Sequence, residues 1–295
     1  MRRITVRNTV NGILFAMPWF IGFFAFVAYP IAASLYYGFT EYDALNLPSF
    51  VGFRNYIELF KRDTLFWKAL SNTLFYTVFA VPIHIIVGLA LALLLNLRVK
   101  GMEVYRTIYY LPTLVPAVAS SVLWLWILNP QYGLVNFLLR KLGLPGPGWL
   151  ADPVWAKPAL ILMSGWGAGS AVIIYLAGLQ DIPVQLYEAA ELDGATSSQK
   201  TFYITLPMLT PTIFFNLVMG LIGSFQYFTQ AYVMTQGGPV NSTLFYCLYL
   251  YNNAFVYFKM GYASAMAWIL FLIILAASSL VFRTSSGWVY YAAGR

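Results

Sequence analysis

Long apolar runs alternate with short polar segments along the whole chain. Six of these runs contain no Asp, Glu, Lys or Arg, and they cover residues 13–37, 70–96, 108–128, 159–179, 208–234 and 262–282. A helix needs about 20 mostly apolar residues to cross a bilayer. The pattern therefore predicts six membrane-spanning helices. Pro112 and Pro116 fall in the first turns of the third, and we expect Pro211 to open the fifth, because proline suits a first helical turn.

Basic residues near the first runs indicate which ends lie in the cytoplasm. Arg2, Arg3 and Arg7 precede the first run with no acid among them, and the loop 97–107 carries three bases against one acid. Short cytoplasmic loops carry an excess of Lys and Arg. We therefore expect both termini inside. The first run is also longer than the roughly 7–15 apolar residues of a signal peptide, which favours an uncleaved helix.

The composition supports a membrane protein and excludes several other classes. Of the 295 residues, 60% are hydrophobic and 9% are charged, whereas soluble domains are about 25% charged. The single cysteine, Cys247, cannot form a disulfide within the chain. A membrane enzyme would need clustered His, Asp or Ser in the spans, but the chain has one histidine, His84, which we interpret as a neutral packing residue.

The absence of charge inside the six runs bears on how transport would be driven. Carriers driven by ion gradients usually rely on a buried ionisable residue in the membrane. None of the six runs offers a carboxylate. We therefore expect energy to be delivered from outside the bilayer, with an ion-gradient-driven secondary carrier as the alternative.

The segment 180–207 holds four of the ten acidic residues. We expect Asp181 to cap a short helix and Gly194 to end it in the left-handed conformation. Thr196 or Ser197 can cap a second short helix. A pair of alanines on the first helix leaves a shallow surface that another backbone can approach. The segment is either a docking element for a partner or an interfacial connector without one.

This segment resembles the EAA signature of ATP-binding-cassette (ABC) importer permeases, and we call residues 180–207 the EAA loop. The matching positions are Glu188, Ala189, Ala190, Gly194, Ile204, Leu206 and Pro207. Stretches that resemble sugar permeases of the maltose-transporter type are residues 50–56, 69–73, 106–112, 237–239 and 261–265. The resemblance covers nearly the whole chain and is greatest to the compact glycerol-phosphate, lactose and trehalose-type relatives.

The resemblance implies an all-α polytopic protein with the type I ABC importer permease fold and six transmembrane helices. It implies an arm, a first helix and an external loop over residues 1–69, a core of five helices over 70–284 that includes the EAA loop, and a tail over 285–295. It also implies residence in the cytoplasmic (inner) membrane of a bacterium or archaeon.

The resemblance further implies partners and a function. The expected partners are a second homologous permease, a cytoplasmic ATPase dimer and an extracytoplasmic solute-binding protein, with no nucleic acid. The chain is expected to be no enzyme and to hold no cofactor, since ATP and Mg²⁺ would bind the ATPase, and it contains no Gly-x4-Gly-Lys-Ser/Thr phosphate loop. The implied function is ATP-driven import of a sugar, oligosaccharide, polyol or glycerol phosphate.

The resemblance also assigns roles within the EAA loop, which would seat in a cleft of the ATPase as a coupling helix. Glu188 would make a charge-assisted contact, and Ala189 and Ala190 would give close packing. Gly194 would make the turn. The positions Ile204, Leu206 and Pro207 complete the signature where the chain returns to the membrane.

Candidates for the substrate path are polar and aromatic residues within the predicted spans. A sugar site needs hydrogen-bonding groups and aromatic faces in a concave pocket. The fifth span offers Asn216, Gln226, Tyr227 and Gln230, of which the two glutamines are expected to share one helical face, and the fourth offers Trp166. The alternative is that such groups only bond neighbouring helices.

Overall fold

The computed structural model describes residues 2–97 and 99–290, with side chains from Asn8 onward. In this part of the chain almost every element is a helix, and the only sheet is the pair of two-residue strands β1 (Thr40–Glu41) and β2 (Ser49–Phe50). Internal contacts divide the chain into two compact units, residues 1–63 with 250–271, and residues 64–249 with 272–295. Each unit is described in turn.

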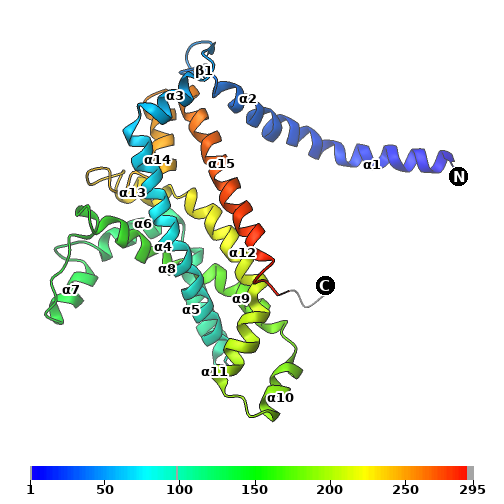
Figure 1. Ribbon diagram of the computed structural model, residues 1–295, viewed down its shortest axis with the longest axis vertical. Coiled ribbons are helices and arrows are strands. Elements are labelled where there is room, and N and C mark those ends of the chain that lie inside the picture. The colour runs from blue at the N-terminus through cyan, green and yellow to red at the C-terminus, as the bar shows by residue number, and fades with distance from the viewer. Residues whose placement is uncertain (1, 98, 291–295) are drawn as a thin grey trace. The chain divides into compact units, whose positions relative to one another are not determined.

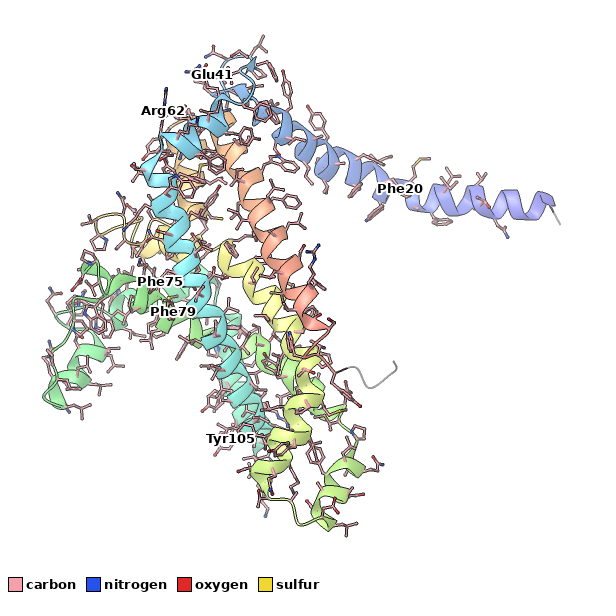
Figure 2. The ribbon with its side chains drawn as sticks, viewed as in Figure 1. Phe20, Glu41, Arg62, Phe75, Phe79 and Tyr105 are labelled. Atoms are coloured by element: carbon pink, nitrogen blue, oxygen red, sulfur yellow. The ribbon has the colours of Figure 1, made fainter. Side chains whose placement is uncertain are left out.

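The first unit contains a long N-terminal helix and a short β-hairpin formed by β1 and β2. The elements α1 (Arg2–Phe23), the π-helical turn η1 (Phe24–Ala28) and α2 (Tyr29–Tyr37) follow one another without a break. None of the most apolar part of this helix is buried within the chain, and Phe20 projects from it in Figure 2. After the hairpin comes α3 (Arg54–Lys61).

The start of α15 (Met260–Ser285) completes the first unit. The indole N–H of Trp268 donates a hydrogen bond to Ser34 Oγ at 3.1 Å, and the hydroxyl of Tyr262 donates one to the carboxylate of Asp63. Gly261 lies against the backbone of Thr40 so closely that no Cβ would fit. These contacts join segments that are far apart in the sequence.

The second unit is built around α4 (Thr64–Leu95), with α8 (Ala156–Trp166), α9 (Gly169–Gln180) and α12 (Leu206–Phe225) packed against it, as Figure 1 shows. Gly88 allows the close approach of α9, since a Cβ there would lie 3.2 Å from the Cβ of Ala171. Phe75 and Phe79 project from α4 one turn apart (Figure 2), with ring centroids 4.7 Å apart. The remaining elements of this unit are α5 (Met102–Leu114), α6 (Ala117–Ile127), α7 (Leu134–Lys141), the 3-10 turn η2 (Trp149–Ala151), α10 (Val184–Leu192), α11 (Ser197–Lys200), the π-helical turn η3 (Thr201–Thr205), α13 (Thr229–Met234) and most of α14 (Tyr246–Tyr251). The π-helical turn η4 (Asn252–Val256), which follows α14, belongs to the first unit.

Asn72 holds three segments of the second unit together. Its side chain is fully buried, and its Nδ2 donates hydrogen bonds to the carbonyls of Asn241 and Leu244 at 2.9 and 3.0 Å. Its Oδ1 accepts a hydrogen bond from Lys157 Nζ at 3.2 Å. Next to it, Thr73 Oγ1 accepts a hydrogen bond from the backbone N–H of Tyr246. The loop before α14 is thus fixed to α4 and to the start of α8.

The spans agree in number with the prediction once broken helices are counted. Within residues 2–97 and 99–290, four helices are long and apolar enough to cross a membrane, and two helix pairs, α5–α6 and α8–α9, are bent by 99° and 44°. Counting each pair as one span gives six. The larger bend follows from Pro116, because the residue before a proline avoids helical geometry, and Val115 is accordingly extended (φ −75°, ψ 124°).

The fifth span does not open at Pro211 as predicted. The helix runs from Ser197 onward, and Pro211 lies inside α12. A proline leaves the carbonyl four residues earlier without its usual N–H donor. Here that carbonyl belongs to Pro207, and the hydroxyl of Thr210 donates to it at 2.6 Å. The hydroxyl replaces the missing hydrogen bond, and the helix continues.

Candidate functional site

Three helix interruptions in the second unit open onto one cavity of about 630 Å³. They are the α5–α6 bend at residues 112–117, the α8–α9 bend at 163–170, and the break between α12 and α13. The middle of α4 forms the remaining wall. Irregular backbone inside a membrane protein is tolerated where it is buried in protein or lines a cavity. The three breaks therefore point to this cavity as the functional centre of the unit.

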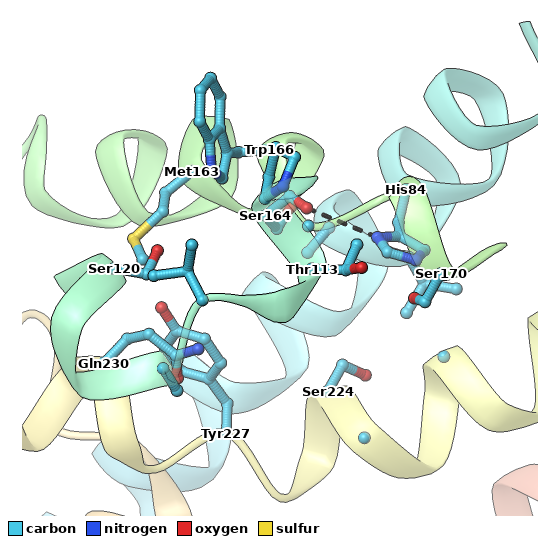
Figure 3. Close-up of a pocket in the computed structure, with 18 of the residues that line it drawn as sticks. His84, Thr113, Ser120, Met163, Ser164, Trp166, Ser170, Ser224, Tyr227 and Gln230 are labelled. Atoms are coloured by element: carbon cyan, nitrogen blue, oxygen red, sulfur yellow. Dashed lines mark hydrogen bonds between the residues drawn. The ribbon is translucent and has the colours of Figure 1, made fainter. Parts of the chain in front are cut away.

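The wall of the cavity is neutral and mixed in character. Figure 3 shows its hydroxyl, amide, imidazole and indole groups. The polar and aromatic residues that line it are Tyr76, His84, Thr113, Ser120, Ser164, Trp166, Ser170, Ser224, Tyr227 and Gln230. No Asp, Glu, Lys or Arg is among the lining residues, and no cluster of metal-ligating side chains occurs in residues 2–97 and 99–290.

Some of these polar groups are held in place by neighbouring helices. The Nδ1 of His84 lies 3.4 Å from the carbonyl oxygen of Ser164, across the space between α4 and α8 (Figure 3). Ser224 Oγ donates to Thr77 Oγ1 at 3.1 Å, which joins α12 to α4. The hydroxyl of Ser164 donates a hydrogen bond to the carbonyl of Ile161 in the same helix. A buried polar group keeps its position when it is hydrogen-bonded, so these walls are preorganised.

Aromatic rings form the two ends of the polar wall. The rings of Tyr76 and Tyr227 lie with centroids 4.2 Å apart, at the break that follows α12. Trp166 meets Trp124 edge to face at 5.9 Å, at the end of α8. Hydroxyl and amide groups between aromatic faces suit an uncharged polar ligand, because such groups fix orientation by hydrogen bonds while the rings supply apolar contact.

The structure brings together three of the five predicted path residues. Trp166, Tyr227 and Gln230 line the cavity. Asn216 is buried outside the lining and donates a hydrogen bond to the carbonyl of Thr212 at 2.9 Å. The expectation that Gln226 and Gln230 share one helical face is wrong, because α12 ends at Phe225 and α13 begins at Thr229.

Sequence reasoning missed the contribution of α4 and of the two bends. Tyr76 and His84 on α4 face the cavity, and so do the backbone and side chains around Pro112 and Pro116. The available signal was the pair of prolines inside a predicted span. Breaks of this kind, together with Gly167 in the next span, mark the places where transmembrane helices unwind around a ligand.

The EAA loop has the helix–turn–helix form that the sequence predicted. The helix α10 ends at a turn in which Gly194 is left-handed, with φ of +78°. Thr196 caps α11 through a reciprocal capping box with Gln199. Asp181 does not cap α10, because α9 continues to Gln180 and leaves Asp181 at its C-terminal end, so that Pro183 precedes α10.

The predicted coupling residues lie on an exposed tip with a packed base. Glu188, Ala189 and Gly194 are exposed. Ile204 is half-buried against the apolar cluster formed by the ends of α4, α9 and α12, and Leu206 and Pro207 are half-buried where α12 begins. The apolar side chain of Leu192 is 91% exposed. Such a tip is typical of a surface that another protein covers.

A neutral cavity bounded by broken helices, among helices long enough to span a membrane, is typical of a membrane transport protein. Residues 66–288 match the family described as "Binding-protein-dependent transport system inner membrane component". The chain belongs to this family of ABC transporter permeases, and it is a multi-pass membrane protein.

Relatives and a solved structure agree with this assignment. The chain is 43% identical over 289 residues to the probable ABC transporter permease protein YesP of Bacillus subtilis, covering 97% of this chain and 93% of that one. It is 38% identical over 282 residues to the lactose transport system permease protein LacF of Rhizobium radiobacter, covering 92% and 93%.

A chain of the bacterial alginate ABC transporter, solved in complex with an alginate pentasaccharide-bound periplasmic protein, matches with a TM-score of 0.83 at 26% identity. The match covers 96% of both chains. The predicted family and the type I importer permease fold are thereby confirmed.

Proposed function

We propose that the chain forms one half of the translocation path of an ATP-driven importer for a carbohydrate, either a sugar, an oligosaccharide or a related polyol. The supporting observation is the neutral cavity, where three broken helices present hydroxyl, amide and aromatic groups. Carbohydrates combine many hydroxyls around the ring edge with apolar C–H faces, which such a wall matches. Relatives of the chain are named for lactose and for trehalose/maltose transport.

Within the cavity we assign contacts by the chemistry of the lining groups. The half-exposed indole of Trp166 offers a face on which a sugar ring stacks. Tyr227 and Gln230 offer a hydroxyl and an amide at the opposite break. His84, with one ring nitrogen directed to Ser164, contributes its other nitrogen to the cavity.

The remaining parts of the importer are separate chains in this proposal. A second homologous permease completes the path, and an extracytoplasmic binding protein delivers the substrate. A cytoplasmic ATPase dimer binds ATP and Mg²⁺ and receives the exposed tip of the EAA loop, with Glu188, Ala189 and Ala190 on the docking helix and Gly194 at its turn. Both termini of this chain then lie in the cytoplasm.

Reconstitution of the whole complex in proteoliposomes tests the proposal. The probes are labelled oligosaccharides, including lactose and alginate pentasaccharide. Uptake is expected only with ATP inside and binding protein outside. Uptake driven by an ion gradient alone would instead establish a secondary carrier.

Variants separate the cavity from the docking tip. Trp166→Ala and Gln230→Ala are expected to lower uptake while the ATPase still co-purifies. Glu188→Lys and Gly194→Pro are expected to abolish uptake in a chain that still inserts. Glu103→Lys, an exposed charge reversal outside the EAA loop, serves as the matched control and should transport normally.

A further inference from the structure

Two side-chain ties join α10 to the segment that precedes α12. The hydroxyls of Tyr187 and Thr205 lie 2.9 Å apart and share a hydrogen bond. Lys200 Nζ lies 2.8 Å from Glu191 Oε1 and forms an ion pair with it. At the exposed tip of the EAA loop, α10 and the segment before α12 are therefore joined by the turn at Gly194 and by these two side-chain contacts.

The spacing of the ties depends on a π-helical turn. Tyr187 and Glu191 are four residues apart on an α-helix, where such pairs share one face. Lys200 and Thr205 are five residues apart, which in an α-helix would turn their side chains about 140° from each other. The turn η3 is π-helical, with bonds that span five residues. Thr205 Oγ1 also donates to the carbonyl of Lys200 at 3.3 Å. In this conformation the side chain of Lys200 reaches Glu191 and that of Thr205 reaches Tyr187, both on α10.

The two ties differ in their surroundings. The side chain of Thr205 is buried, and Tyr187 packs against the apolar cluster at the ends of α4, α9 and α12. Glu191 is exposed, and the hydrogen bond and charge of Lys200 lower its pKa. Exposed ion pairs contribute little, whereas a hydrogen bond sheltered from water resists exchange with solvent. The inner tie is therefore the stronger mechanical link.

The segment that receives both ties continues into the cavity wall. Residues from Ser197 onward run through η3 into α12 as one candidate span. That helix packs on α4 and lines the cavity with Gly220, Gly223 and Ser224. A displacement of α10 that reaches η3 is transmitted along a continuous helix to the site.

We propose that Tyr187 and Thr205 are positioning residues that make α10 and α12 move as one body, so that displacement of the tip is delivered to the cavity. The inference rests on the proposed coupling role of the EAA loop. It adds a specific link, which lies outside the matched signature positions, and a reason for the π-helical turn.

Nucleotide-dependent accessibility of the cavity tests the link without knowledge of the substrate. The reporter is Gly223→Cys, which faces open space in the cavity, in a Cys247→Ala background. The permease–ATPase complex is labelled with a water-soluble maleimide, with and without ATP. Tyr187→Phe and Thr205→Val are expected to reduce the nucleotide-dependent change in labelling rate about threefold to tenfold, the factor that one lost hydrogen bond represents.

Controls separate this link from a loss of folding or docking. Tyr203→Phe alters a tyrosine of the same turn that is 80% exposed, and it should respond like the parent. The ATPase should co-purify with every variant, and the double variant should be no worse than either single one. A full nucleotide response in Tyr187→Phe would overturn the link, whereas a parent that shows no nucleotide response would overturn the proposed function and the link with it.

The outer tie supplies a second measurement if the inner variants do not assemble. Glu191→Lys and Lys200→Glu should each weaken the nucleotide response. The charge-swapped double variant should restore it, because the ion pair re-forms in reverse. Failure of the double variant to recover any response would count against a cross-linked tip.

Discussion

Asn72→Leu is expected to destabilise the second unit strongly, although the two side chains branch at the same carbon. The buried amide makes two hydrogen bonds to backbone carbonyls, of Asn241 and Leu244, and accepts one from the charged Lys157. The neutral bonds contribute about 1 kcal/mol each, and one to a charged group about 1.5–3 kcal/mol. Burial of leucine offsets about 1.5 kcal/mol, the low end for that side chain, because the amide it replaces is already buried. The expected net loss is about 2–4 kcal/mol.

This loss can be measured through the single cysteine. Cys247 follows Tyr246, whose backbone N–H is bound by the residue next to Asn72 on α4. A thiol-reactive fluorogenic dye therefore reports melting at the affected place. At about 2–4 °C per kcal/mol for chains of this order of size, Tm should fall by about 4–16 °C.

Two further variants sharpen the test. Asn72→Asp keeps the acceptor for Lys157 but turns a carboxylate oxygen toward both carbonyls in place of N–H donors, so its Tm should also fall well below that of the parent. Ser71→Ala, which removes one exposed hydrogen bond to the carbonyl of Lys68, should change Tm by less than about 1 °C. If Asn72→Leu melts within about 2 °C of the parent, the three-way tie is not what fixes this loop.

Three more expectations concern other parts of the chain. Gly194→Val should weaken ATPase co-purification more than Gly194→Asn, because the φ of +78° is costly for a β-branched residue while a Cβ meets no steric obstacle there; quantitative pull-down measures this. Gly169→Ala should lower Tm by several degrees, since its Cβ would lie 2.7 Å from a backbone carbonyl of α5, whereas Gly223→Ala meets nothing within 4 Å and should not. The pKa of Asp43 is lowered, first by the backbone N–H of Asn46, so the turn is stabilised above the usual carboxyl pKa and loses this support as pH falls through the lowered value. Amide exchange at the turn should distinguish Asp43→Ala from the parent at neutral pH, and the difference should shrink as the pH falls through the lowered pKa of Asp43.

Much of the fold could be predicted because it is encoded locally. Apolar runs set the spans, and the left-handed turn at Gly194 follows from a glycine at a helix end. Interruptions were harder to locate. The run that contains Phe225 and Thr229 is continuously apolar enough to be one helix, and only packing against other helices shows where it breaks. The helix α12 begins before Pro211, and the hydroxyl of Thr210 donates to the carbonyl of Pro207, which this proline leaves without an N–H donor.

The cavity could be predicted only in part for a related reason. Trp166, Tyr227 and Gln230 were found by residue type, as polar or aromatic groups inside spans. Tyr76 and His84 reach the same space because α4 packs beside α8 and α12, and such long-range neighbours leave no mark in a single sequence. Asn216 has a suitable polar side chain, but its amide donates a hydrogen bond to the carbonyl of Thr212 in the same helix. Residue type alone predicts which side chains could line a substrate path, and the packing of the helices determines which of them do line the cavity.

The first unit has a consequence for the order in which the chain is made. Its N-terminal part and residues 250–271 are separated by nearly 190 residues. At about 5–20 residues per second, the ribosome delivers the second part on the order of 10–40 s after the first. In that interval Ser34 and Asp63 lack Trp268 and Tyr262, their partners in the finished unit. The exposed apolar helix 8–37 can already have entered the lipid, since apolar segments insert by hydrophobicity alone. The arrival of α15 therefore completes a unit whose N-terminal helix was made long before.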